Sequence, residues 1–331
     1  MITVGIIANP AAGKDIRRLV AHGRTVSNQE KANTLRRVFA GLVASGVERV
    51  LVMPEFSGLA RPAMDDTKGR LQSEYVDMVP AESQHDSTRA ARAMAEQDAG
   101  CIVTLGGDGT NRVVAKGCGS VPLVPISTGT NNVFPQMVEG TLAGLAAGAV
   151  ATGAVPRAEV TRRSKTLDVF VDGERTEIAL VDAAVTYQAF VGARAVWQLD
   201  SLAELYLTRA EPASIGLSSI GSRIRPMQMD DQHGLYVRLA GEAGPNATVV
   251  RAPVAPGVIN DIQVQEWALL IPGERHPVDV CPGTVALDGE REVELYPRRR
   301  VEIALNADGP LVVDIARVHE HLARTSADRV R

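Results

Sequence analysis

Apolar and polar positions follow two different periods along the first 150 residues. Short aliphatic runs predict strands, and they lie at residues 2–10, 47–55, 75–80, 101–107 and 121–128. Helix-like spacing separates these runs, and the first such helix begins at a Ser-x-x-Glu capping box at 27–30 and continues to Gly46. Similar spacing predicts three more helices. One lies at 86–100, one begins just after Gly107, and one ends at about Val150. Strands that alternate with helices favour an α/β domain with a doubly wound parallel sheet.

The pattern changes after residue 154. Two strand-like runs flank Asp172-Gly173, a dipeptide typical of a two-residue hairpin turn. One stretch, 193–211, has helix-like spacing and predicts a helix. Further alternating runs predict strands, and they lie at 234–241, 248–257, 261–271, 283–296 and 299–307. We therefore expect a mostly β sandwich at 154–309 after an α/β domain at 1–153, and a strand-to-helix tail at 310–331 for which a return to the first domain is open.

Composition excludes several classes of protein. The 331 residues suggest about two domains, and 45% of them are hydrophobic, which is enough for proper cores. A net charge of −4 gives no reason to expect a nucleic acid or an anionic membrane as partner. The sequence has no uninterrupted apolar run of about 18 residues and no basic region before its first apolar stretch, so we expect neither a transmembrane helix nor a signal peptide. Three widely spaced cysteines suit a reducing cytoplasm.

Three loops rich in small residues follow predicted strands: "NPAAGKD" at 9–15, "GGDGTN" at 106–111 and "STGTNN" at 127–132. Ligands of parallel sheets bind beyond the carboxyl ends of the strands, where all three loops would lie. Glycine lets backbone N–H groups approach a phosphate, and a helix N-terminus adds further donors. One such loop alone is as easily a simple turn. Three at corresponding positions, one with a lysine, favour a nucleotide or phosphate site.

Asp108 is the exception within these loops. A carboxylate at a helix N-terminus is stabilised by the helix dipole, which is sufficient as a structural reason. Beside phosphates, however, a bare carboxylate is repelled unless it holds a metal ion or accepts a proton. Both tasks belong to phosphoryl transfer, so a kinase is a physically coherent hypothesis for this chain.

These loops resemble those of the NAD kinase/diacylglycerol kinase superfamily. Together with "IGLSSIG" at 215–221, they resemble its acetoin-catabolism protein X branch of ATP-NAD kinase-like proteins, and the resemblance spans nearly the whole chain. "LDGERE" at 287–292 is similar to a pattern in the lipid-kinase relatives. The resemblance implies a two-domain NAD kinase-like fold, ATP and Mg²⁺ in the crevice, and a homo-oligomer. It implies that Asp108 accepts the proton of the attacking hydroxyl, which in an NAD kinase is the adenosine ribose 2′-hydroxyl. The candidate nucleotide-binding and phosphate-binding residues are Asn9, Gly13, Lys14, Gly106, Gly107, Gly109, Thr110, Asn111, Thr128, Gly129, Thr130, Asn131 and Asn132.

The acceptor side departs from NAD kinases. Their Asn-Glu pair would fall at Val181 and Asp182, so the amide is lost and the acid is retained in a shorter form. Asp182 either contacts the ligand or is a strand-end residue capped by local hydrogen-bond donors. Ser218 and Ser219 lie in the glycine-serine loop at 214–222, the nearest counterpart of a second NAD kinase motif. Glu290 matches a glutamate that lies close to the acceptor in lipid kinases, although a hairpin turn is the simpler interpretation of Asp288-Gly289.

Three functions therefore stay open. The first is an ATP-dependent kinase with a nucleotide acceptor, NAD by resemblance. The second is the same chemistry on a lipid or another small hydroxylated cofactor. The third is a nucleotide-binding regulator without catalysis, which the departing acceptor motifs favour and the intact Asp108 loop opposes.

Overall fold

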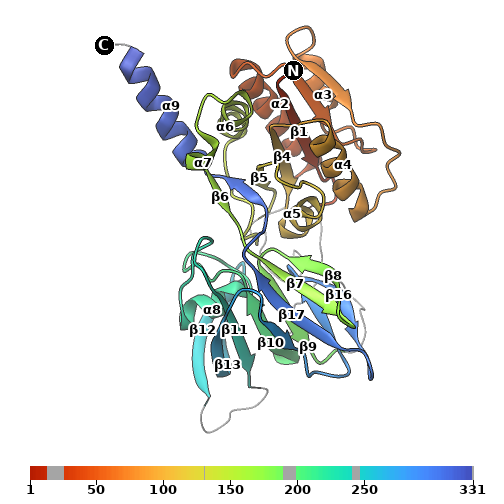
Figure 1. Cartoon of the computed structure of the whole chain (residues 1–331), viewed down its shortest axis with the longest axis vertical. Coiled ribbons are helices and arrows are strands. Elements are labelled where there is room, and N and C mark those ends of the chain that lie inside the picture. The colour runs from red at the N-terminus through yellow and green to blue at the C-terminus, as the bar shows by residue number, and fades with distance from the viewer. Residues whose placement is uncertain (13–25, 130, 189–198, 241–246, 330–331) are drawn as a thin grey trace.

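The structure is a computed structural model that describes residues 1–12, 26–129, 131–188, 199–240 and 247–329. Figure 1 shows two bodies, one above the other, joined by extended strands. The upper body holds a sheet with helices on both faces, and the lower body consists mainly of strands. No helix in the described ranges is long and apolar enough to cross a membrane.

The first sheet has seven strands in the order β3-β2-β1-β4-β5-β18-β6. Neighbours from β3 to β18 run parallel, and only β6 is antiparallel to its neighbour. The strands are β1 (Thr3–Ala8), β2 (Arg49–Val52), β3 (Gln72–Tyr75), β4 (Cys101–Gly106), β5 (Leu123–Ser127), β6 (Thr161–Arg163) and β18 (Leu311–Val313). The helices are α2 (Asn28–Ala44), α3 (Arg61–Asp66), α4 (Gln84–Glu96), α5 (Asp108–Ala115), α6 (Gly140–Thr152), α7 (Arg157–Val160) and α9 (Ile315–Arg329).

Helix α2 begins where its capping sequence predicts. The Ser27 hydroxyl accepts a 3.1 Å hydrogen bond from the Glu30 N–H, which satisfies one of the donors that a helix start leaves open. Helix α6 packs closely on α2 because its glycines have no side chain. A Cβ at Gly144 would lie 2.2 Å from the Val38 carbonyl oxygen, so this contact requires glycine. The two helices cover one face of the sheet and bury its aliphatic side chains.

The second body is a sandwich of two antiparallel sheets, with strand orders β12-β13-β11-β10-β9-β15-β16 and β14-β17-β7-β8. Both sheets contribute side chains to one shared core, among them Leu167, Tyr206 and Ile303. The strands are β7 (Thr166–Val171), β8 (Glu174–Ala179), β9 (Asp182–Thr186), β10 (Leu202–Leu207), β11 (Gly234–Leu239), β12 (Thr248–Ala255), β13 (Val258–Leu270), β14 (Arg275–Pro277), β15 (Gly283–Leu287), β16 (Glu290–Leu295) and β17 (Val301–Asn306). The short helices are η1 (Leu199–Ser201) and α8 (Ser218–Ile224).

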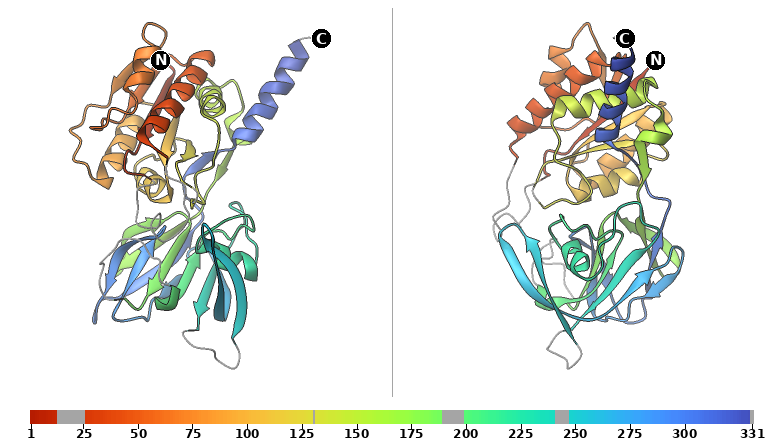
Figure 2. Two further views of the ribbon diagram at one scale, coloured as in Figure 1. Left: turned by 180° about the vertical axis from the view of Figure 1, so that it is seen from behind. Right: turned by 90° about the vertical axis from the view of Figure 1, so that its left-hand side faces the viewer.

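The chain crosses between the two bodies twice. It leaves the first sheet after β6 and returns to it through β18, which pairs with both β5 and β6. Helix α9 then runs beside α6, as Figure 2 shows, and His319 Nε2 lies 3.0 Å from the Leu142 carbonyl oxygen. The predicted fold class, an α/β domain followed by a mostly β sandwich, is therefore confirmed.

Three local predictions are wrong. The helix expected at 193–211 is a central strand, β10, over residues 202–207, and 193–198 lie outside the described residues. All six residues of β10 are buried, and ladders to β9 and β11 satisfy its backbone, so tertiary pairing overrides the helix-like spacing. The loop expected at 214–222 contains the helix α8, because Ile220 packs into the core below it. The strand expected at 75–80 lies earlier, at Gln72–Tyr75.

Candidate active site

A cavity of about 550 Å³ lies at the carboxyl ends of the parallel strands. Its walls include residues that follow β1, β4 and β5, and the second domain adds Pro256, Asp288 and Glu290. Strand order reverses between β1 and β4, because the chain proceeds outward to β2 and β3 before it returns to β4. A ligand cavity at such a reversal is the general arrangement in open α/β sheets.

Asp108 is the first residue of α5 and lines this cavity. Its Oδ1 accepts a 2.8 Å hydrogen bond from the Phe134 N–H, and the Val133 N–H lies 3.1 Å from both carboxylate oxygens. The first backbone bond of α5 runs from the Asn111 N–H to the Gly107 carbonyl, so the N–H groups of Gly109 and Thr110 have no partner within the helix. The helix start thus combines an oriented carboxylate with donors suited to an anion.

The glycine-rich turn before α5 is held from inside. Asn111 is fully buried, accepts a 2.6 Å hydrogen bond from the Thr104 hydroxyl and donates one of 2.9 Å to the Gly107 carbonyl. The Asn9 side-chain amide donates a 2.9 Å hydrogen bond to the Thr110 hydroxyl and joins the loops after β1 and β4. Asn111 therefore shapes the turn, whereas Asn9 and Thr110 also reach the cavity wall.

Lys31 fixes the loop after β1 from α2. Its fully buried ammonium donates hydrogen bonds to the carbonyl oxygens of Asn9, Pro10 and Ala12, at 3.2, 3.0 and 2.8 Å. A buried cation requires such partners because its loss of hydration is costly. The first part of the predicted phosphate loop is thus held in place by a side chain that the loop motif does not contain.

The loop after β5 carries further polar groups. The Ser127 hydroxyl donates to the Gly129 carbonyl at 2.8 Å and accepts from the Asn132 amide at 2.8 Å, so this turn is braced locally. The Thr128 hydroxyl and the Asn131 side-chain oxygen are buried, and neither has a hydrogen-bond partner in the described part of the chain. Asn131 lines the cavity, where this oxygen suits a hydroxyl donor of a ligand.

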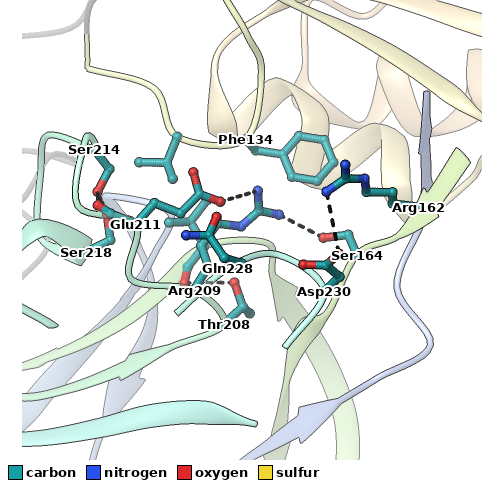
Figure 3. Close-up of polar contacts among 12 residues, drawn as sticks. Phe134, Arg162, Ser164, Thr208, Arg209, Glu211, Ser214, Ser218, Gln228 and Asp230 are labelled. Atoms are coloured by element: carbon teal, nitrogen blue, oxygen red, sulfur yellow. Dashed lines mark hydrogen bonds and ion pairs between the residues drawn. The ribbon is translucent and has the colours of Figure 1, made fainter. Parts of the chain in front are cut away.

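The second domain supports the same loop through Arg209. Figure 3 shows the Arg209 guanidinium below the Phe134 ring, between Glu211 and Ser164, and its carbon lies 5.4 Å from the ring centroid. The guanidinium donates a 2.9 Å hydrogen bond to the Ser164 hydroxyl. Burial lowers the pKa of Arg209, although Glu211, Asp108 and Asp288 oppose this shift. Positive charge from the second domain therefore acts on the carboxylates of the site.

Arg112 connects α5 to acids of the second domain. Its buried guanidinium lies 3.2 Å from the Glu177 carboxylate, 3.8 Å from that of Asp288 and 4.0 Å from that of Glu290. Asp288 accepts hydrogen bonds from the backbone N–H groups of residues 180–182. Burial raises the pKa of Asp288, while Arg112 and these N–H groups oppose the rise. This network places the β15–β16 turn against the helix that begins with Asp108.

The structure brings most of the predicted site residues together. The cavity is lined by Asn9, Gly107, Asp108, Gly109, Thr110, Gly129, Asn131, Asn132 and Glu290. Gly106, Asn111 and Thr128 lie behind this wall, and a Cβ at Gly106 would lie 2.5 Å from the Thr110 Cβ. Gly13, Lys14 and Thr130 lie outside the described residues.

Three acceptor candidates do not line the cavity. Asp182 is buried at the start of β9, and its backbone N–H and carbonyl bond to Asp288. Ser218 and Ser219 are fully buried in α8, where the Ser219 hydroxyl donates to the Gly216 carbonyl at 2.6 Å. The acids of the second domain that line the cavity are Asp288, in the turn that the sequence predicts between β15 and β16, and Glu290, at the start of β16.

Sequence reasoning missed one part of the wall. Residues 53–57, which follow β2, and residues 80–87, which lead into α4, include eleven lining residues. Neither segment carries a ligand-binding motif, and the second carries only a helix-capping sequence, Ser83-x-x-Asp86. Their one signal for a site is their place after two strands of a parallel sheet, the same criterion that singled out the glycine-rich loops.

The fold is the two-domain fold of ATP-NAD kinase-like proteins. Residues 4–154 match the ATP-NAD kinase N-terminal domain, so the first domain is kinase-like. Residues 165–308 match the acetoin catabolism protein X C-terminal domain. The chain is 40% identical over 333 residues to "Acetoin catabolism protein X" of Cupriavidus necator strain H16. This alignment covers 97% of the present chain and 92% of that protein. The chain therefore belongs to the acetoin catabolism protein X family, and the resemblance predicted from its motifs is confirmed.

Proposed function

We propose that the chain is an ATP-dependent kinase that transfers the γ-phosphate to a hydroxyl of a nucleotide, most specifically the ribose 2′-hydroxyl of NAD. The observation that carries the proposal is the position of Asp108. Its oriented carboxylate and the N-terminus of α5 share one cavity with loops from β1 and β5. The kinase-like first domain supports the same reaction.

In this proposal Asp108 accepts the proton of the attacking hydroxyl. The N–H groups of Val133 and Phe134 hold the carboxylate in one orientation, so little reorganisation is needed when the proton moves. The donors at the start of α5 receive the transferring phosphoryl group. Positioning and charge stabilisation of this kind supply most of the catalysis in phosphoryl transfer.

Magnesium fits the site as a partner of phosphate rather than as an all-protein centre. Within the described residues no group of three or more acidic, histidine or cysteine side chains forms a metal cluster. Mg²⁺ is commonly held by one or two carboxylates together with substrate phosphates. Asp108 and Glu290 both line the cavity and would supply these carboxylates. When bound, the ion neutralises phosphate charge and polarises the phosphoryl group.

The cavity lining favours a nucleotide acceptor over a lipid. The second domain contributes two carboxylates and one proline, and not an extended apolar surface, within the described lining. Carboxylates accept hydrogen bonds from ribose hydroxyls and from amino groups of bases, whereas an acyl chain requires apolar contacts. We keep ATP as donor and NAD as acceptor on this basis.

Three further parts of the proposal concern the whole molecule. Because β6 belongs to the first sheet, we move the predicted limit between 153 and 154 to residue 163, and we assign 310–331 to the first domain because β18 pairs with β5 and β6. We also propose a cytoplasmic homo-oligomer whose ligands are small nucleotides. Sedimentation of the purified chain tests the oligomer independently of any catalytic assay.

A screen of acceptors tests the proposed reaction. The chain is incubated with ATP and Mg²⁺ together with NAD, NADH, diacylglycerol or a panel of sugar and cofactor alcohols, and products are identified by mass spectrometry. We expect phosphorylation of NAD at the 2′ position. Turnover of diacylglycerol alone would move the acceptor to the lipid class. Nucleotide binding without turnover of any acceptor would favour a regulator.

A further inference from the structure

The cavity has two chemically different parts. Glycine-rich loops after β1, β4 and β5 form one part, which contains Asp108. The other part, here called the outer lobe, is formed by the lining residues within 53–57 and 80–87. It lies at the β2 and β3 side of the sheet, next to the β1 loop. A contact of 3.7 Å between the Ser87 hydroxyl and the Met53 sulfur joins its two segments.

Phe56 presents an exposed aromatic ring to the outer lobe. It is 71% exposed and yet lines the cavity, and it is the only aromatic side chain among the described lining residues. Its loop is held in place, because the Glu55 carboxylate accepts hydrogen bonds from the backbone N–H groups of Ser57, at 2.6 Å, and Leu59, at 2.5 Å. Leu59 is buried and anchors the loop in the core. The ring is therefore presented by a fixed loop, which suits stacking on a planar group.

The outer lobe is unsuited to phosphate. The N-terminus of α4 already carries a carboxylate, because Asp86 belongs to its capping box and accepts hydrogen bonds from the N–H groups of Ala81 and Ser83, at 2.9 and 3.2 Å. Burial alone would raise the pKa of Asp86, but hydrogen bonds from Arg89 and these N–H groups outweigh it and lower the pKa. Glu55 and Glu82 add two carboxylates, and no described residue of the lobe is lysine, arginine or histidine.

These observations divide the ligand between the two parts of the cavity. Phosphates go to the glycine-rich loops, where helix α5 offers backbone donors. A planar, uncharged group that carries hydrogen-bond donors fits the outer lobe, because the ring of Phe56 offers a stacking face and the carboxylates offer acceptors. An adenine ring with its exocyclic amino group has this chemistry.

We propose that the outer lobe is an adenine subsite in which Phe56 stacks on the base of the nucleotide whose phosphates bind at the glycine-rich loops. The inference rests on the proposed function, since it assumes a nucleotide ligand, and adds to it the residue that selects the base. Both ATP, the proposed donor, and NAD, the proposed acceptor, contain adenine, so either nucleotide could place its base in this subsite. The variants below distinguish them.

The test is equilibrium binding, measured by calorimetry, of ATP, NAD and inorganic tripolyphosphate to the full chain in the presence of Mg²⁺. We expect Phe56→Ala to weaken the binding of one adenine nucleotide by about tenfold, as expected for the loss of one base-stacking contact. Phe56→Tyr keeps the ring and should bind within about twofold of wild type. Trp267→Ala is the matched control, since Trp267 is another exposed aromatic residue, on β13, that does not line the cavity.

Tripolyphosphate separates stacking from damage to the phosphate site. Its affinity should stay within about twofold in Phe56→Ala, because it has no base. Weakening of ATP alone assigns the lobe to the donor, and weakening of NAD alone assigns it to the acceptor. Equal loss of tripolyphosphate, or unchanged binding of both nucleotides, overturns the adenine subsite while the proposed kinase stands. A wild-type chain that binds neither ATP nor NAD refutes the proposed function itself, and the subsite with it.

Discussion

The backbone N–H of Phe134 donates a 2.8 Å hydrogen bond to Oδ1 of Asp108. The loop after β5 therefore orients the carboxylate at the start of α5, although the two residues belong to different βα units. Arg209 of the second domain lies against the Phe134 ring, with its guanidinium carbon 5.4 Å from the ring centroid. Both domains thus contribute to the orientation of the proposed catalytic residue.

Lys31→Met tests how the loop after β1 is held. The substitution removes an ammonium that bonds to three carbonyl oxygens, of which that of Ala12 is buried and those of Asn9 and Pro10 are half-buried. We expect the free energy of unfolding to fall by about 3 kcal/mol, as measured by urea denaturation at neutral pH. Lys68→Met is the matched control, because Lys68 is exposed, and it should change stability by less than about 0.5 kcal/mol. Equal stability of the two variants would contradict this role for Lys31.

Asp288→Asn tests the buried acid in the β15–β16 turn. Burial raises the pKa of Asp288 in the folded protein, so the folded state binds its proton more tightly than the unfolded state. The stability from this group is complete below the pKa of an unfolded aspartate, about 3.9, and is lost as the pH rises through the folded-state pKa.

The asparagine variant lacks this titration. Its free energy of unfolding relative to wild type should therefore increase as the pH rises from about 4 to neutrality. Urea denaturation of both proteins at several pH values measures the difference. A difference that stays constant, or that falls with pH, would show that the pKa of Asp288 is not raised by folding.

Gly109→Ala tests the approach of the second domain to α5. A Cβ at this position would lie 3.2 Å from Oε1 of Glu290, closer than ordinary contact, and the Glu290 side chain is free enough to move because it is 35% exposed. Alanine is favoured over glycine in a helix by about 1 kcal/mol, so thermal stability should not fall. We expect the turnover number to decrease on the order of tenfold, because Glu290 is displaced from the cavity.

The displacement of Glu290 has its own control. Glu290→Gln keeps the size of the side chain and removes its charge. If the carboxylate matters, both variants should lose turnover, and only Gly109→Ala should alter the geometry of the turn. Full activity in Gly109→Ala would show that the close contact between these two residues has no part in the reaction.

The sequence predicts the parts of the site that depend on local chemistry. The turn from Leu105 to Asn111 follows from an aliphatic run, glycines and a helix start, and the structure places Asp108 at that helix start. The same holds for the two hairpins at Asp172-Gly173 and Asp288-Gly289, where both residues of each turn have positive φ. Such turns accept few residue types, so the dipeptides are reliable signals.

The remaining parts depend on contacts between distant segments. Strand β10 has helix-like spacing and becomes a strand because β9 and β11 pair with it on both sides. Asp182, Ser218 and Ser219 are buried within β9 and α8 and do not line the cavity, and no local pattern predicts this burial. Lys31 and Phe56 belong to no motif. The role of Lys31 depends on its contact with the folded loop after β1, and that of Phe56 depends on the place of its own loop in the cavity wall.

Asp108→Asn gives the most direct test of the central claim. The claim is that Asp108 accepts the proton of a nucleotide hydroxyl during phosphoryl transfer from ATP. The measurement is the rate of NADP formation from NAD and ATP with Mg²⁺, for wild type and variant, together with calorimetric binding of ATP as a control for the integrity of the site. We predict that the wild type forms NADP and that the variant loses activity by about 10²- to 10⁴-fold while it still binds ATP. Full activity in the Asp108→Asn variant would contradict the account.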